Sequence, residues 1–165
     1  MIIEGRTWKF GDNINTDVII PARYLRTTDK EELARYVFYD VEPRYYKKAK
    51  EEGRIIVAGK NFGCGSSREH AVIALKYSGT LAVIARSFAR IFFRNAINLG
   101  LPVIMVDEVD RISQDDYLRI DFNKGRIENK TKEEIYDFKP YPKFIMEIIS
   151  CGGIVNYIKN NKELW

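Results

Sequence analysis

The sequence has few of the residues on which metal centres depend. Its 165 residues include two cysteines and one histidine, whereas a structural zinc or iron–sulfur site usually takes about four such ligands. Neither Cys64 nor Cys151 belongs to a CxxC pair or lies beside His70 at a metal-ligand spacing. We therefore expect no metal site in this chain, and two free thiols rather than a disulfide, as is usual in a reducing compartment.

Long apolar runs are also missing. No stretch approaches the roughly 20 apolar residues that a membrane-spanning helix needs. The N-terminus does not show the basic and then apolar pattern of a signal peptide. From these absences we expect a cytoplasmic protein without membrane contact. With 45% hydrophobic residues, the chain is long enough for one compact domain over residues 1–165.

Charge of one sign does not dominate the chain. The 27 Lys and Arg residues are interleaved with 23 Asp and Glu residues, which leaves a net charge of +4. The densest basic stretch, residues 45–50, is followed directly by Glu51 and Glu52. We interpret this stretch as a solvated helix face rather than a phosphate-binding patch, and we expect no nucleic-acid partner.

Apolar runs alternate with helical patterns from residue 54 onward, which favours an α/β fold with a buried parallel sheet. In this part the sequence predicts strands over 55–58, 81–84 and 103–106 and helices over 69–77 and 88–99. Before it we expect a strand over 2–10 and helices around 29–38 and 43–52. After it we expect an antiparallel hairpin of strands 117–122 and 126–129, then short helices over 143–149 and 154–159 hinged at 152–153.

The most informative segment is residues 59–71, Gly-Lys-Asn-Phe-Gly-Cys-Gly-Ser-Ser-Arg-Glu-His-Ala, between an expected strand and an expected helix. In parallel sheets, ligands collect at this junction, where a helix N-terminus adds a partial positive charge. The three glycines let backbone N–H groups approach an anion closely. Arg68 supplies a planar fork that can hold a carboxylate by two hydrogen bonds. The segment predicts an anion-binding turn with serine hydroxyls at its centre.

A second interpretation of this segment is purely structural. Ser66 and Glu69 have the spacing of a capping box, in which the serine hydroxyl accepts a hydrogen bond from a free helix N–H. Spacing alone favours this capping role. The two interpretations are compatible, because Ser67 offers a second hydroxyl. His70 is interpreted as a structural hydrogen-bonding residue and is left out of the catalytic set.

Three segments together resemble a known family. Residues 59–71 resemble the signature of the swivelling domain of the aconitase superfamily. Residues 11–21, Gly-Asp-Asn-Ile-Asn-Thr-Asp-Val-Ile-Ile-Pro, resemble its second signature, and residues 87–102 are similar to its third. The segments follow the family's order, and the resemblance covers essentially the whole chain. It implies a single swivelling β/β/α domain and a two-subunit hydro-lyase that moves a hydroxyl between neighbouring carbons through an alkene.

The resemblance also implies roles for individual residues. Ser66 would be the catalytic base that removes a proton, Ser67 and Arg68 would bind substrate carboxylates, and Thr16 and Asp17 would line the site. The family's 4Fe–4S cluster would belong to a separate large subunit, in a heterodimer or heterotetramer, and none to this chain. Asn15 stands where many family members have an aspartate. Asp12 and Asn13 are explained equally well as turn formers.

Substrate choice is expected from the loop Tyr24-Leu25-Arg26-Thr27. Small subunits that act on isopropylmalate have an apolar residue after the Tyr-Leu pair, whereas Arg26 resembles the pattern of methanogen-type homoaconitases. We therefore expect a hydroxy tricarboxylate such as homocitrate, isomerised to homoisocitrate through cis-homoaconitate. Arg26 would bind the extra carboxylate, and Thr27 would add a hydroxyl contact.

Two other interpretations remain open. The small subunit of 3-isopropylmalate dehydratase is the close alternative, in which Arg26 points into solvent. A stand-alone module that binds small anions or RNA through the glycine turn is a third interpretation, and a steep salt dependence of RNA binding would support it.

Overall fold

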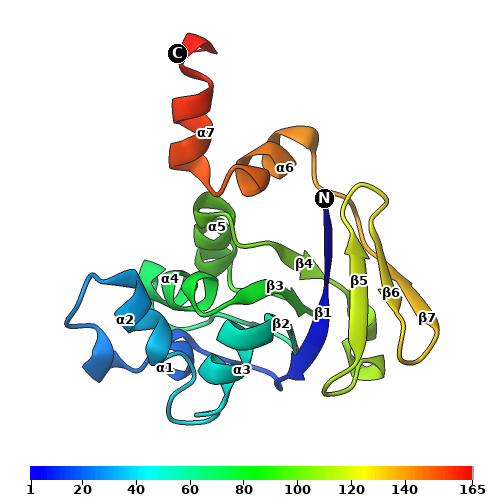
Figure 1. Cartoon of the computed structure of the whole chain (residues 1–165), viewed down its shortest axis with the longest axis horizontal. Helices are drawn as coiled ribbons and strands as arrows, with labels where there is room; N and C mark the ends of the chain where they lie inside the picture. The colour runs from blue at the N-terminus through cyan, green and yellow to red at the C-terminus, as the bar shows by residue number, and fades with distance from the viewer. Residues whose placement is uncertain (165) are drawn as a thin grey trace.

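The computed structural model describes residues 1–164, and one seven-stranded sheet organises them (Figure 1). The strands are β1 (Ile2–Lys9), β2 (Arg54–Ala58), β3 (Thr80–Ala85), β4 (Val103–Met105), β5 (Tyr117–Asp121), β6 (Arg126–Asn129) and β7 (Glu134–Asp137). The α-helices are α1 (Thr16–Ile19), α2 (Lys30–Arg35), α3 (Tyr45–Glu52), α4 (Glu69–Tyr77), α5 (Arg90–Leu99), α6 (Lys143–Ser150) and α7 (Ile154–Asn160). Short 3-10 helices are η1 (Ala22–Tyr24), η2 (Asp107–Arg111) and η3 (Lys162–Leu164).

The strand order is β4-β3-β2-β1-β5-β6-β7, and β1 joins two halves of different character. On one side β1 runs parallel to β2, with Thr7 opposite Ile55, and β2, β3 and β4 continue the parallel arrangement. On the other side β1 pairs antiparallel with β5, with Ile3 opposite Ile120, and β6 and β7 extend that half as a meander. The parallel half therefore ends in loops on one common edge, the carboxyl edge of β1 to β4.

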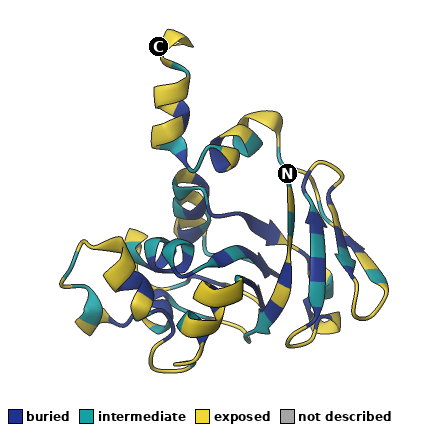
Figure 2. Ribbon diagram, in the orientation of Figure 1, coloured by how far each residue is buried: buried dark blue, intermediate teal, exposed yellow. Residues whose placement is uncertain are grey.

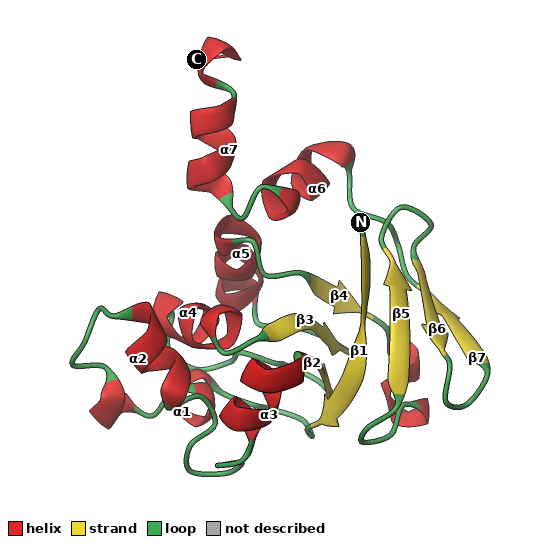
Figure 3. Cartoon of the chain, in the orientation of Figure 1, coloured by secondary structure: helices red, strands yellow, loops and turns green. Residues whose placement is uncertain are grey.

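The parallel strands are buried on both faces, because side chains alternate along a strand. Every residue of β2 is buried. Ile56 and Ala58 belong to the core beneath the helices, whereas Ile55 and Val57 belong to a second core that includes Leu118 of β5 and other residues of the antiparallel half. The sheet must therefore curl, so that its antiparallel half covers one face of the parallel half while the helices cover the other (Figures 2 and 3).

The expected α/β class and parallel sheet are confirmed, with boundaries close to those predicted. The helix expected around 29–38 is shorter and ends at Arg35. The cause lies at Phe38, which adopts a left-handed backbone with φ 53°, donates its N–H to the Ile19 carbonyl at 2.8 Å and stacks on Phe10. Strand β7 and helix α1 were not expected. Four residues of each are too few for a clear periodic pattern.

The C-terminal helices α6 and α7 meet at the predicted hinge. Gly152 and Gly153 have φ values of 89° and 123°, which a side chain would disfavour. Helix α7 projects beyond the rest of the ribbon (Figure 1). Among residues 1–164, no helix combines the length and apolar character needed to cross a membrane.

Candidate functional site

The first and second signature loops lie side by side because their strands, β1 and β2, are parallel neighbours. Backbone hydrogen bonds join them along their length. Asn13 donates its N–H to the Lys60 carbonyl, Gly63 donates to Ile14, and Thr16 donates to Cys64, at 2.7 to 2.8 Å. The loops thus form one rigid unit at the carboxyl edge of the sheet.

Two glycines of the second loop are required by close packing. Gly63 has φ 82°, and a Cβ there would lie 2.2 Å from the Phe92 ring. A Cβ on Gly59 would lie 1.8 Å from the Asp12 carboxylate. That carboxylate accepts a hydrogen bond from the Lys60 N–H at 2.7 Å. Asp12 therefore acts as the turn former that its position suggested.

The third signature segment supports the same loop from its other side. Asn61 donates its N–H to the Ser87 hydroxyl at 2.8 Å, and a short parallel bridge pairs Phe62 with Phe88. The Phe62 and Phe88 rings pack edge to face. Sequence reasoning assigned no role to Ser87. A hydroxyl directly after an expected strand, opposite a glycine loop, is the signal that could have indicated its supporting role.

The Ser66 hydroxyl lies beside Thr16 of the first loop. The two side-chain oxygens are 3.1 Å apart, and the Thr16 hydroxyl also reaches the Ser66 carbonyl at 3.2 Å. Thr16 is buried with 2% of its surface exposed, while Ser66 is exposed. The site therefore presents one solvent-accessible hydroxyl held by a buried one.

The capping box expected at Ser66 and Glu69 is wrong. Helix α4 begins at Glu69 with Arg68 as its N-cap residue, and no side chain of residues 1–164 caps it. The extended backbone of Arg68 separates Ser66 from the helix start, so the serine hydroxyl bonds to Thr16 instead. The uncapped start of α4 leaves backbone N–H donors available to an anion.

Arg68 holds an unsatisfied donor at this place. Its Nη1 atom lies 3.7 Å from an Asp17 carboxylate oxygen, and it is buried without a hydrogen-bond partner among residues 1–164. Asp17 uses the same oxygen to accept the Ala22 N–H at 3.1 Å. Buried polar groups normally have a partner. A ligand carboxylate would supply the missing acceptor.

Asn15 has a local structural task. Its side-chain oxygen accepts the Val18 N–H at 2.8 Å, which makes Asn15 the N-cap of helix α1. Asparagine and aspartate are both good N-caps. The departure of Asn15 from the family's aspartate therefore leaves α1, and with it Thr16 and Asp17, in place.

The proposed specificity loop begins at Tyr24, the last residue of η1, and leads to α2 at the periphery of the ribbon (Figure 1). Tyr24 stacks on Tyr36 with ring centroids 4.0 Å apart, and Leu25 is half-buried. Thr27 accepts the Asp29 N–H at 3.0 Å, which makes its hydroxyl part of the turn before α2. Arg26 is exposed. Among residues 1–164, no hydrogen bond or ion pair connects Arg26 or Thr27 to Ser66, Ser67 or Arg68.

The side chains that could act as metal ligands lie apart from one another. Cys64 and Cys151 are free thiols, and both are partly buried. His70 is half-buried on helix α4. Within residues 1–164, no three His, Cys, Asp or Glu side chains gather closely enough to hold a metal ion.

Comparison with known proteins places this geometry in a family. The family model described as the aconitase C-terminal domain matches residues 9–108, a span that contains all three signature segments. The chain belongs to this family. The match includes the loops that hold Ser66, Thr16 and Arg68, and it ends within η2.

Relatives within the aconitase C-terminal domain family extend the similarity to the full chain. A protein named 3-isopropylmalate dehydratase small subunit from Thermodesulfovibrio yellowstonii is 56% identical, over 99% of this chain and 98% of the relative. One named 3-isopropylmalate dehydratase small subunit 1 from Archaeoglobus fulgidus is 54% identical, over 96% and 98%. The crystal structure of a 3-isopropylmalate dehydratase from Methanocaldococcus jannaschii superposes with a TM-score of 0.92 at 51% identity, over 99% and 97% of the two chains. The expected fold is therefore confirmed.

Proposed function

We propose that this chain is the small subunit of a 3-isopropylmalate dehydratase, a hydro-lyase. The observation that carries the proposal is the full-length similarity to small subunits of that name, at 56% and 54% identity. The tricarboxylate substrate expected from Arg26 finds no support in these relatives. 3-Isopropylmalate dehydratase therefore replaces homoaconitase as the leading interpretation, with a substrate that has a branched alkyl group in place of the third carboxylate.

The site supports the chemistry of such an enzyme. Ser66 is exposed and held by Thr16, so its oxygen can meet a substrate proton. Arg68, with its buried unpartnered Nη1, would grip a carboxylate beside that proton. The guanidinium and the uncapped N–H groups of α4 would stabilise negative charge on the serine oxygen. Ser66 would then return the proton on the neighbouring carbon during rehydration.

Loss of the substrate hydroxyl needs a Lewis acid, which a 4Fe–4S cluster supplies when bound. The donors of residues 1–164 do not form a ligand set for such a cluster. We therefore propose that a large subunit carries the cluster, and we assign this chain the proton transfer and the carboxylate grip.

We infer that the large subunit docks on the carboxyl edge of β1 to β4, because the catalytic loops open there. A hollow of about 370 Å³ lies on the same edge, lined by Phe88, Arg90, Phe93, Arg94 and Met105. Met105 and the neighbouring Ile91 are exposed by 56% and 50%. Phe88 connects this hollow to the catalytic loop through its bridge with Phe62. Exposed apolar side chains with arginines around them are typical of interfaces.

The test is reconstitution. The purified chain is mixed with a candidate large subunit whose cluster is intact, and hydration of unsaturated dicarboxylates and tricarboxylates is measured by loss of alkene absorbance. We expect no turnover by either subunit alone, and turnover of the isopropyl-substituted dicarboxylate by the mixture. A mixture that acts only on tricarboxylates would overturn the substrate assignment, and an inactive but assembled mixture would overturn the assignment of the reaction.

A homoaconitase is the second candidate, and Arg26 is the observation that favours it. Its guanidinium is exposed, and no ion pair or side-chain hydrogen bond of Arg26 occurs among residues 1–164. An exposed cation attracts carboxylates and would favour a substrate that has a third one. The same reconstituted enzyme separates the candidates through the ratio of kcat/KM for the two substrate classes.

A further inference from the structure

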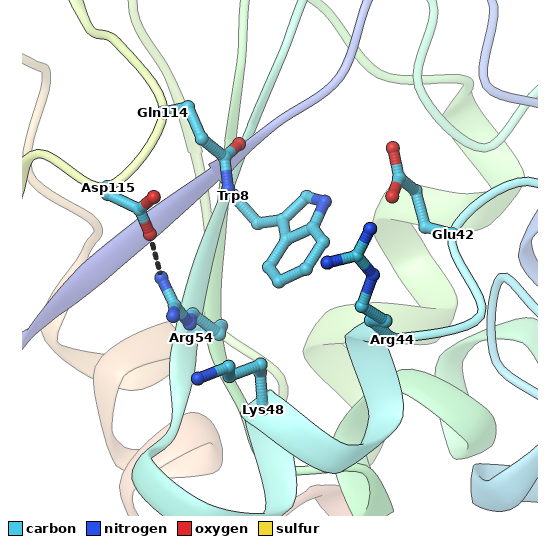
Figure 4. A pocket seen from close by; sticks show the side chains of 7 residues that line it. All are labelled: Trp8, Glu42, Arg44, Lys48, Arg54, Gln114 and Asp115. Atoms are coloured by element: carbon cyan, nitrogen blue, oxygen red, sulfur yellow. Dashed lines mark hydrogen bonds and ion pairs between the residues drawn. The ribbon is translucent and has the colours of Figure 1, made fainter.

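A second cavity is lined by residues outside the three signature segments, and its wall includes the amino end of β2. It has a volume of about 560 Å³ and is lined by Trp8, Glu42, Arg44, Lys48, Arg54, Gln114 and Asp115 (Figure 4). Arg54 is the first residue of β2, whereas the catalytic loop follows Ala58, the last residue of that strand. The proposed reaction therefore leaves this cavity unused. Its volume is within the roughly 300–1,000 Å³ range of small-molecule sites.

Arg54 is a buried cation in the cavity wall, and several contacts hold its side chain in place. Its side chain is 5% exposed and pairs with Asp115 at 2.6 Å and Glu52 at 2.7 Å. It also donates to the Thr7 carbonyl at 3.2 Å. Its Nε atom is nevertheless buried without a hydrogen-bond partner among residues 1–164. An unsatisfied donor on a buried cation costs free energy, so the other three contacts must hold Arg54 in place.

Backbone contacts fix Asp115 beside this arginine. Its backbone is left-handed with φ 66°, a conformation that aspartate tolerates better than most residues with a side chain. Arg6 donates to its carbonyl at 3.0 Å, and the Asp115 N–H bonds to the Thr7 carbonyl at 3.1 Å. These contacts keep the carboxylate partner of Arg54 in a fixed position.

Two further cations face the cavity from one turn at the start of α3. Arg44 and Lys48 are exposed, and no ion pair or side-chain hydrogen bond of either occurs among residues 1–164. Figure 4 shows Lys48 pointing toward Arg54 and Arg44 lying beside the Trp8 ring. Arg54, Arg44 and Lys48 carry three positive charges here, and Asp115, Glu52 and Glu42 carry three negative charges, so the formal charges balance. Because Asp115 and Glu52 both pair with Arg54, the cations Arg44 and Lys48 are left to bind an anion, with Glu42 as one carboxylate beside them.

Trp8 provides an apolar surface next to these cations. Its indole is half-buried and is held edge to face by Tyr45, with ring centroids 5.3 Å apart. The Arg54 guanidinium lies 5.4 Å from the indole centroid. A ring fixed in this way offers a flat surface for a hydrophobic body.

We propose that this cavity is a binding site for a small organic anion, a carboxylate or phosphate monoester with an aromatic or branched apolar body. Lys48 and Arg44 bind the anionic group, and the apolar body lies on Trp8. The site is separate from the catalytic edge, so it does not depend on the proposed reaction.

The direct test observes Trp8 during titration. The indole N–H signal of Trp8 is followed in ¹H–¹⁵N spectra and assigned with a Trp8→Phe variant. The probes are benzoate, phenyl phosphate, benzyl alcohol and inorganic phosphate. We expect saturable shifts of the Trp8 signal with benzoate or phenyl phosphate, and the stronger of the two identifies the anionic group. Much weaker shifts are expected with benzyl alcohol, which lacks the anionic group, and with inorganic phosphate, which lacks the apolar body.

Variants at exposed positions test the role of charge without threatening the fold. Lys48→Met should weaken binding of the stronger probe about tenfold or more, as expected for a lost charge-assisted hydrogen bond. Lys47→Met is the matched control, because Lys47 is exposed on the same helix but does not line the cavity. Equal affinities of Lys48→Met and the parent chain, or shifts that do not saturate, would overturn the proposal.

Calorimetric titration of the assembled two-subunit enzyme with the stronger probe should give the same affinity as the chain alone. Loss of binding there would show that the large subunit covers the cavity, and would overturn it as a ligand site of the working enzyme.

Discussion

At the residue scale, the contacts of Ser66 distinguish its two interpretations. A capping serine would bond to a helix N–H, but this hydroxyl lies 3.1 Å from Thr16 and two residues before the N-cap, Arg68. Pattern spacing could not show this, because it cannot predict where a helix begins to within a residue or two. The interaction with Thr16 joins positions 50 residues apart in the sequence and exists only in the folded loops.

Ser66→Ala should therefore abolish turnover and leave stability unchanged. The variant removes the proposed base but no helix cap, so the melting temperature should stay within about 2 °C, as for surface substitutions within ±0.5 kcal/mol. The measurement combines kcat in the reconstituted enzyme with thermal unfolding. Ser67→Ala is the neighbouring control, and it should raise KM more than it lowers kcat. Near-normal kcat in Ser66→Ala would remove the serine from catalysis.

Arg68→Lys should lower kcat/KM by about ten- to a hundredfold, because lysine keeps the charge but loses the planar two-point grip on a carboxylate. The substitution removes the buried Nη1 atom of Arg68. Arg86→Lys offers a control, since Arg86 is also a partly exposed arginine paired with one aspartate, Asp110. Kinetics equal to those of the parent enzyme would show that Arg68 acts as a simple charge.

Arg26→Val tests substrate choice. Under the isopropylmalate assignment, the exposed guanidinium faces solvent, so kcat/KM for the isopropyl-substituted dicarboxylate should change by less than about threefold. Arg23→Val, from the same loop region, controls for general disturbance, although it also breaks a pair with Asp40. A drop of about tenfold or more on tricarboxylates, together with a gain on the alkyl substrate, would restore the homoaconitase interpretation.

At the element scale, strands apolar on both faces were predicted well, and short polar elements were not. The runs in β2 and β3 could hardly be anything other than buried parallel strands, because both faces of each strand are apolar. Strand β7 reads Glu-Ile-Tyr-Asp and places only Tyr136 in the core. Its pairing with β6 depends on contacts that a sequence pattern does not encode.

The turn before β5 supplies a prediction about acid stability. Burial alone would raise the pKa of Asp116, but hydrogen bonds from the Ser113 N–H and the Asn129 amide, with the Lys132 ammonium, outweigh burial and lower it. A carboxyl group with a lowered pKa in the folded state contributes stability above its unfolded value of about 4, and that stability is lost as pH falls through the folded pKa.

Asp116→Asn should accordingly lower the melting temperature at pH 7 by about 2–10 °C, since its amide would present a donor to the donors of Asn129 and Lys132. The difference between the variant and the parent should shrink as pH falls below about 4. Asp137→Asn is the control, because its side chain is 79% exposed and makes only a loose ion pair with Arg126. A difference that is independent of pH would argue against the charge of Asp116 as the cause.

At the scale of the whole molecule, the site arises from topology. Parallel pairing of β1 with β2 brings segments 11–17 and 59–68 together, although they are far apart in the sequence. The glycine loop and Arg68 could be predicted from residue chemistry and Thr16 from family resemblance. The unsatisfied Nη1 of Arg68 and the supporting hydroxyl of Ser87 required the folded structure. The spacing of residues in the sequence does not indicate either feature, because each depends on where separate loops meet in the folded chain.

The same topology predicts where the large subunit docks, and this can be tested by assembly. Met105→Asp and Arg94→Glu alter the hollow on the carboxyl edge of the parallel strands, and each should weaken subunit association about tenfold, as expected for loss of about 1.4 kcal/mol at an interface. Lys124→Glu makes the same charge reversal on the β5–β6 turn and should assemble normally.

Affinity of each variant for the large subunit is measured by calorimetry, with Ser66→Ala as an inactive reference that still assembles. Activity of Arg94→Glu should return at excess large subunit, because segments 11–17 and 59–68 are unchanged in this variant. Normal association of both edge variants would place the partner on another face, and an assembled but inactive Arg94→Glu complex would mean that this edge contributes to the chemistry rather than to docking.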